Sequence, residues 1–137
     1  MASTTQYKYA YLSEPDPSWV PLKEAIDAQY EQFWALPHEE FTNAWKSMPT
    51  TLPEGTPRDL EIGHMNIPVR DGHKSQIRIY RNRPLHDAAL KAGKRLPLVI
   101  IYHGGGWILG SHGVEEGVAR WTCKETGAVI VDVEYRL

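Results

Sequence analysis

Apolar residues recur at helical spacing in the first third of the chain. Those of the first segment fall every three or four residues and are Leu22, Ile26, Tyr30 and Phe33. This period predicts an amphipathic helix over 19–35, with Ser18 as its N-cap. A shorter helix is predicted over 39–48, where the shared face consists of Phe41, Ala44, Trp45 and Met48. A run with Pro49, Pro53 and Pro57 then favours neither helix nor strand.

The period changes after residue 60. Residues 62–69 and 76–80 flank Asp71-Gly72 and predict two strands around a tight turn. The second strand alternates, so we expect one face, with Ile77 and Ile79, to be buried and the other, with Arg78 and Tyr80, to be wetter. Residues 83–95 are polar, include Pro84 and Gly93, and are predicted to be a connection.

The last third predicts a strand, a loop, a helix and a second strand. Residues 96–102 form a continuous apolar run, typical of a strand buried on both faces. A glycine-rich loop follows over 103–110. A helix is expected over about 114–126, with Ser111 as its cap, Gly127 as its end, and Val114, Val118 and Trp121 on one face. Residues 128–133 complete a right-handed βαβ unit of the α/β class, whose loop lies where such sheets bind ligands.

Composition limits the function classes. The chain has 137 residues, enough for one modest core, and 15 basic against 17 acidic residues give a net charge of −2. We therefore expect no nucleic-acid partner and no attraction to an anionic membrane. The single cysteine, Cys123, excludes an internal disulfide and is typical of a core residue. Without a signal-like or membrane-length apolar segment, the expected location is the cytosol.

Histidine spacing gives no metal site. The six histidines are His38, His64, His73, His86, His103 and His112, and none is paired at ligand spacing. The run from His38 to Thr42 lacks the second histidine of a zincin helix. Scattered surface histidines are the preferred interpretation, and we expect neither a metal nor a cofactor.

The loop His103-Gly104-Gly105-Gly106-Trp107 carries the candidate chemistry. A merely flexible connection would rarely place bulky residues directly after three glycines. A dinucleotide-binding loop is a weak alternative: Asp132 and Glu134 could serve the ribose, but the third glycine of that motif is replaced by Leu109. A Walker loop fails because Ser111 and His112 follow Gly110 where lysine and serine or threonine are required. The remaining alternative is an oxyanion hole built from bare backbone N–H groups.

The pattern H-G-G-G-W-x-x-G-S, a helix, and a strand ending in E-Y-R-L resembles hormone-sensitive-lipase-type carboxylesterases of the α/β-hydrolase fold. The family has D-Y-R-L, so Glu134 is a small departure. The resemblance implies that Gly105 and Gly106 donate their N–H groups to the oxyanion, that Gly104 serves the turn and that His103 braces the loop. Trp107 is expected to wall the substrate pocket.

The resemblance also implies the domain plan. Residues 1–58 are expected to hold a tail, two cap-like helices and a proline-rich linker. Residues 59–137 are expected to hold the first four strands and one crossover helix of an α/β-hydrolase sheet. No serine has a G-x-S-x-G setting, and Ser111 has the wrong spacing. The family places its serine, acid and histidine after the D-Y-R-L strand, so no catalytic residue is expected before Leu137.

The sequence therefore predicts the amino-terminal portion of a serine carboxylic-ester hydrolase, inactive as this chain alone, whose complete enzyme takes a small ester and needs no cofactor. A non-catalytic product that acts by binding is the alternative, and a dinucleotide binder comes third. Self-association is expected through the strand 96–102, which would lack a neighbour along one edge.

Overall fold

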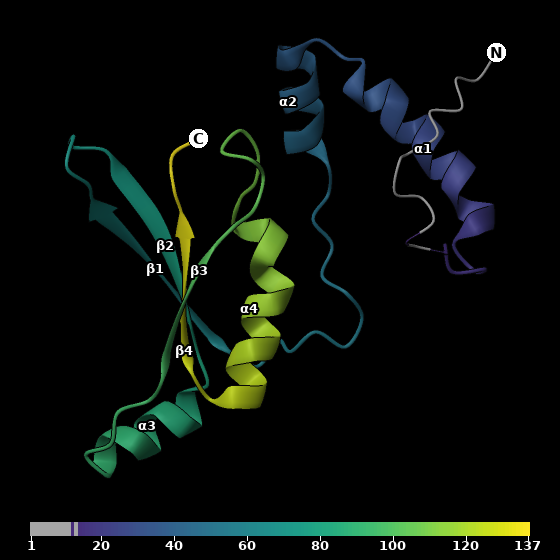
Figure 1. Ribbon diagram of the computed structural model, residues 1–137. Coiled ribbons are helices and arrows are strands. Elements are labelled where there is room, and N and C mark those ends of the chain that lie inside the picture. Colours follow the sequence, from purple (N-terminus) through teal and green to yellow (C-terminus); the bar gives the residue numbers. More distant parts are fainter. Residues whose placement is uncertain (1–11, 13) are drawn as a thin grey trace, which may run out of the picture. The chain divides into compact units, whose positions relative to one another are not determined.

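The computed structural model describes residue 12 and residues 14–137. It divides into two compact units, of which the first ends at Phe41 and the second runs from Thr42 to Leu137. Figure 1 identifies the helices and strands of both. Among the described residues, every helix is too short or too polar to cross a membrane.

The first unit is built around helix α1, Val20–Trp34, and the beginning of α2, His38–Ser47. Pro21 lies in the first turn of α1, where no backbone N–H is needed. The predicted cap was wrong: Trp19 occupies the N-cap position, and Ser18 instead donates from its N–H and hydroxyl to Asp16 Oδ1. The ring of Phe41 lies 4.7 Å from Phe33 and 5.0 Å from Trp34, centroid to centroid, which joins the two helices.

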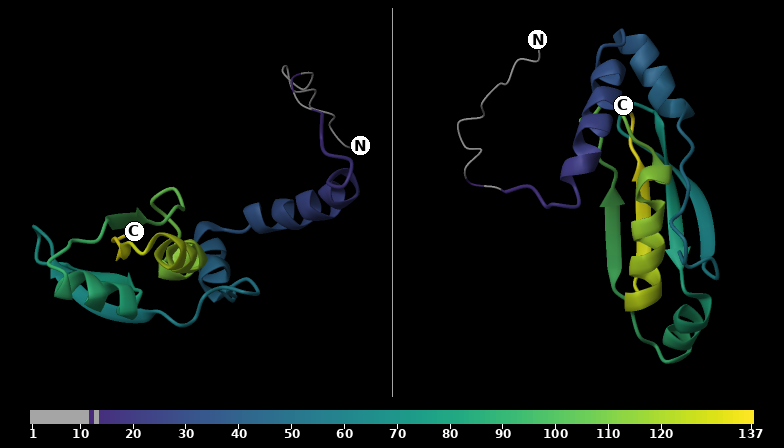
Figure 2. Two further views of the ribbon diagram at one scale, coloured as in Figure 1. Left: turned by 90° about the horizontal axis from the view of Figure 1, so that it is seen from below. Right: turned by 90° about the vertical axis from the view of Figure 1, so that its right-hand side faces the viewer.

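The second unit contains a four-stranded sheet with strand order β1-β2-β4-β3. The strands are β1 Glu61–Pro68, β2 Lys74–Arg81, β3 Leu98–Tyr102 and β4 Val129–Glu134. β2 pairs antiparallel with β1 and β4, whereas β3 and β4 are parallel. Helix α4, His112–Thr126, connects the parallel pair and lies along β4 (Figure 2). The α/β class predicted from the sequence is confirmed.

Residues 83–95 differ from their prediction as a polar connection. They contain helix α3, Arg83–Lys91, in which Pro84 falls in the first turn and Arg83 pairs with Asp87 at 3.2 Å. Proline in the first turn is compatible with a helix, so Pro84 does not argue against one here. In Figure 1, α3 lies at the end of the sheet opposite the glycine-rich loop.

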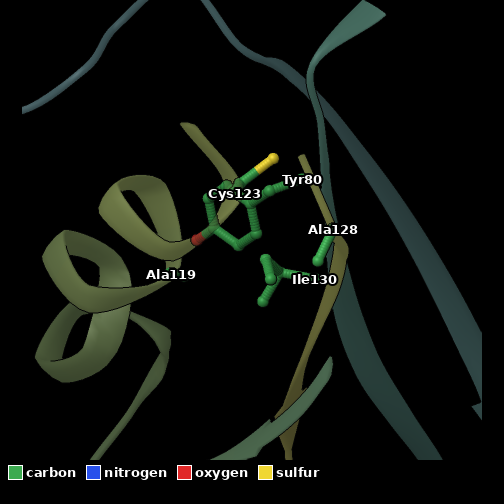
Figure 3. Packing of buried hydrophobic residues seen from close by; sticks show 5 residues of the cluster. All are labelled: Tyr80, Ala119, Cys123, Ala128 and Ile130. Carbon is green, nitrogen blue, oxygen red and sulfur yellow. The ribbon is translucent and has the colours of Figure 1, made fainter. Parts of the chain in front are cut away.

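The core lies between α4 and one face of the sheet (Figure 3). Its fully or nearly fully buried members are Tyr80, Ala119, Cys123, Ala128 and Ile130. Cys123 is thus a core residue, as predicted. The expectation that Tyr80 faces water was wrong, because α4 covers that side of β2. The inner face of α4 carries the buried residues Ala119 and Cys123, whereas Val114, Val118 and Trp121 are exposed.

Strand β3 is covered on one face only. Val99 and Ile101 pack against the core, while the side chains of Leu98, Ile100 and Tyr102 are 60%, 50% and 64% exposed. β3 is also the last strand of the described sheet, with β4 as its neighbour. Burial on both faces, as the continuous apolar run predicted, is therefore not observed in the described residues.

Candidate functional site

The glycine-rich loop leaves the carboxyl end of β3 and enters α4, and its backbone conformation requires glycine. Gly105, Gly106 and Gly110 have φ angles of 127°, 61° and 111°. A Cβ atom on Gly105 would lie 2.0 Å from the carbonyl oxygen of Leu109, and one on Gly110 would lie 2.1 Å from His103 Nδ1. These two glycines are needed for both conformation and space. Gly106 has open space around it, so only its φ angle favours glycine.

Trp107 adopts φ 63°, the positive-φ conformation that residues with a Cβ atom rarely take. Its side chain is 82% exposed, so burial of the indole does not explain the strain. Left-handed non-glycine residues cost about 1–3 kcal/mol and persist where the surrounding structure enforces them, often at functional sites.

The loop closes on itself and leaves two donors bare. The N–H groups of Ile108 and Leu109 donate to the carbonyl oxygen of Gly105 at 3.1 and 3.0 Å. In the part of the chain that the structure describes, the N–H groups of Gly105 and Gly106 have no hydrogen-bond partner. Both glycines line an open hollow of about 440 Å³, together with Tyr102, His103, Gly104, Trp107 and Tyr135. The hollow thus offers adjacent backbone donors to a ligand.

The entry of the loop is held by His103 and Tyr135. The two rings are stacked, with centroids 4.2 Å apart and planes 13° from parallel. The hydroxyl of Tyr135 donates to the carbonyl oxygen of His103 at 2.7 Å, and His103 Nδ1 lies 2.9 Å from the carbonyl oxygen of Gly104. His103 is buried, and its Nε2 atom has no partner among the described residues. The prediction that His103 lies on the surface was therefore wrong.

The exit of the loop is held by Ser111 and His112. Ser111 caps α4, as predicted, by accepting from the N–H of Gly113 at 3.3 Å. His112 is also buried rather than on the surface. Its backbone N–H donates to Glu134 Oε2 at 2.7 Å, and its Nδ1 atom lies 3.0 Å from Asp132 Oδ2.

Asp132 is fully buried between the sheet and α4. Burial raises the pKa of this carboxyl above its ordinary value, and the nearby charges of His112 and Arg78 act in the opposite direction. Asp132 and Glu134 both contact His112, and neither is among the residues that line the hollow. The arrangement offers no ribose-binding acid at the loop, which argues against the dinucleotide interpretation.

A larger hollow of about 820 Å³ lies between residues 45–53 and the outer face of α4. Its lining includes Trp45, Met48, Val118 and Trp121 and excludes Gly105 and Gly106. Apolar side chains dominate it, and it lacks the bare N–H pair. The smaller hollow is therefore the candidate chemical site.

Comparisons with known proteins agree with this geometry. A family model described as an alpha/beta hydrolase fold matches residues 99–137. An AB hydrolase superfamily protein of Schizosaccharomyces pombe is 28% identical over 85% of this chain and 37% of its own length. The carboxylesterase NlhH of Mycobacterium tuberculosis is 34% identical over 67% of this chain and 25% of its own length.

A solved ester hydrolase from the metagenome of Lake Arreo superposes with a TM-score of 0.68 at 24% identity, over 90% of this chain and 38% of that one. The two strands of the βαβ unit, its crossover helix and the glycine-rich loop together define an α/β hydrolase. The chain has the α/β-hydrolase fold, and the relatives that it resembles include carboxylesterases. It spans well under half the length of the relatives just described.

Proposed function

We propose that the loop from His103 to Trp107 is the oxyanion hole of a carboxylic-ester hydrolase. The observation that carries this proposal is the pair of unpartnered N–H groups of Gly105 and Gly106 on one hollow. During ester hydrolysis the carbonyl oxygen of the substrate becomes negatively charged as the tetrahedral intermediate forms. Fixed backbone donors stabilise that charge without reorganising, which lowers the activation barrier.

The supporting roles follow from the contacts. His103 and Gly104 hold the entry of the loop, and Trp107 stands at the rim of the hollow as a wall for the substrate. The relatives include a carboxylesterase and an ester hydrolase, which supports the same chemistry. No G-x-S-x-G occurs in the 137 residues. We infer that the nucleophile, its acid and its base have no counterpart among them. A cytosolic location stays a prediction from the sequence.

The 137-residue chain is expected to show no turnover of p-nitrophenyl acetate and no stoichiometric labelling of a serine by a fluorophosphonate probe. The oxyanion hole stabilises charge but forms no covalent intermediate, and residual acceleration requires that substrate be held in place. Saturable turnover together with labelling of one serine would contradict this assignment of roles.

The donor role of Gly106 is tested in a form of the protein that carries the nucleophilic serine. Gly106→Val is expected to lower kcat by roughly 10²–10³, the usual cost of losing one oxyanion donor, with a smaller effect on KM. The melting temperature of the same preparation separates lost chemistry from lost folding. A kcat per folded molecule within about two-fold of the parent would exclude Gly106 as a donor, since losing a donor costs far more.

A further inference from the structure

We propose that His112 is a positioning residue of the oxyanion loop, acting through Asp132. The inference rests on the proposed function, since it assigns a purpose to the rigidity of that loop. His112 does not line the hollow. It lies two residues after Gly110, the last residue of the loop, where it fixes the backbone on which Gly105 and Gly106 depend.

The carboxyl end of β4 and the residue that follows hold both ends of the loop. Tyr135 binds the carbonyl oxygen of His103 at the entry, while Asp132 and Glu134 contact His112 at the exit. Between these anchors the loop is compact, because Gly110 packs directly on His103 and Leu109 donates to Gly105. A shift of the backbone at His112 is therefore transmitted through this compact loop to the donor glycines Gly105 and Gly106.

The surroundings of the pair are charged from three elements. β2 supplies Arg78, the cross-strand partner of Asp132, whose Nη1 atom lies 3.1 Å from Glu116 Oε2 on α4. α4 also supplies Arg120, which pairs with the same Glu116 at 2.7 Å. β4 adds Glu134, whose Oε2 atom lies 3.6 Å from His112 Nε2. The two ring nitrogens of His112 thus face one carboxylate each, from Asp132 and Glu134, which favours a fixed ring orientation.

The pair is poorly explained as a source of stability. The His112 and Asp132 side chains are 3% and 0% exposed, so both lose hydration on folding. Their 3.0 Å approach departs from a straight hydrogen bond, and the Asp132 oxygens find no other partner among the described residues. Buried ion pairs of this kind are often no more stabilising than apolar residues of similar volume. The His112–Asp132 pair is better explained as a contact that controls the geometry of the loop.

Hydrogen exchange in the full 137-residue chain tests the proposal without any esterase assay, so it can fail independently of the proposed function. The reporters are the amides of Ile108 and Leu109, which are bonded within the loop, and the amide of Val131 in β4 serves as the reference. We expect His112→Leu to accelerate exchange at both loop amides about ten-fold or more, with Val131 within two-fold, because only local opening is made easier.

A conservative replacement of His112 is expected to preserve the slow exchange of the loop amides. His112→Asn can place an amide N–H near the position of Nδ1 and is expected to keep loop exchange within three-fold of the unmodified chain. Asp132→Leu removes the other partner at similar volume and is expected to accelerate the loop amides as His112→Leu does; it also replaces His112→Leu if that variant does not fold. His73→Leu, an exposed histidine in the β1–β2 turn, is the matched control.

Acceleration confined to the loop in the two leucine variants, and absent from His112→Asn and His73→Leu, supports the positioning role. Unchanged exchange at Ile108 and Leu109 in His112→Leu or Asp132→Leu overturns it. Equal acceleration at the loop and at Val131 also overturns it, because the pair would then stabilise the whole unit rather than position the loop.

Discussion

Adjacent glycines of the loop have different physical requirements. At Gly105 a methyl group would overlap the carbonyl oxygen of Leu109. Because this oxygen belongs to the backbone, it can move away only if the loop itself moves. At Gly106 a methyl group would meet open space and would only disfavour the φ of 61°. Gly105 is therefore required by both packing and conformation, and Gly106 by conformation alone.

This difference predicts unequal losses of stability. Gly106→Ala is expected to lower the free energy of unfolding by about 1 kcal/mol, the cost of a left-handed conformation with a Cβ atom. Gly105→Ala is expected to cost more than about 2 kcal/mol, because the turn closed by Leu109 must open as well. Urea denaturation of the three chains measures both values.

Gly72→Ala is the control for the conformational cost, because Gly72 lies in an exposed turn at φ 84° with open space around it. It is expected to behave like Gly106→Ala. If Gly105→Ala is no more destabilising than these two, the close approach of Leu109 does not constrain the loop.

Single residues also mark the limit of what the sequence predicts. The glycine run carries its own signal, because three glycines before a tryptophan have few physical uses. His112 carries none, since one histidine has no period and its two carboxylate partners lie about twenty residues away. Tyr135 is part of the E-Y-R-L run, yet its contact with His103 depends on tertiary structure.

At the scale of elements, the sequence predicted seven of the eight helices and strands in the described chain and missed only α3. Periodicity and end signals carried these predictions, as Ser111 and Gly127 at the two ends of α4 illustrate. The sequence did not show which face of that helix packs against the core. Large apolar residues dominate a pattern analysis, whereas α4 packs against the sheet through Ala119 and Cys123, whose small side chains permit close approach.

The join between α4 and β4 predicts an unusual dependence of stability on pH. Burial raises the pKa of Asp132, so the folded state binds this proton more readily than the unfolded chain. The contribution of Asp132 is therefore most favourable below the ordinary pKa of 3.8 and is lost as pH rises through the raised value. Asp132→Asn removes that loss. Its free energy of unfolding should improve relative to the unmodified chain as pH rises above 3.8, the ordinary pKa of the carboxyl.

Asp71 provides a control of opposite sign. The hydrogen bond from Arg136 lowers the pKa of Asp71, so its contribution is present above the ordinary value and is lost as pH falls. Asp71→Asn should therefore deteriorate relative to the unmodified chain as pH rises. Denaturant titrations at several pH values measure both trends, and parallel pH profiles for Asp132→Asn and the unmodified chain would contradict the raised pKa.

For the whole molecule, the sequence predicted the α/β class and the place of the glycine-rich loop at the end of β3, because both follow from local order along the chain. It did not predict which surfaces stay uncovered. An apolar strand has the same pattern whether one or both of its faces are covered, and only the strand order shows that β3 has β4 as its neighbour.

The exposed side of β3 predicts that the 137-residue chain self-associates. Leu98, Ile100 and Tyr102 lie on one exposed face of a strand at the edge of the described sheet, and such edges pair readily with other chains. Sedimentation equilibrium should show a mass that increases with concentration, and Ile100→Lys should shift the chain toward monomer, because the charge opposes burial of that face. Val118→Lys, an exposed position on α4, should leave association unchanged. A chain that stays monomeric at every concentration and does not bind the dye ANS would exclude β3 as an association surface.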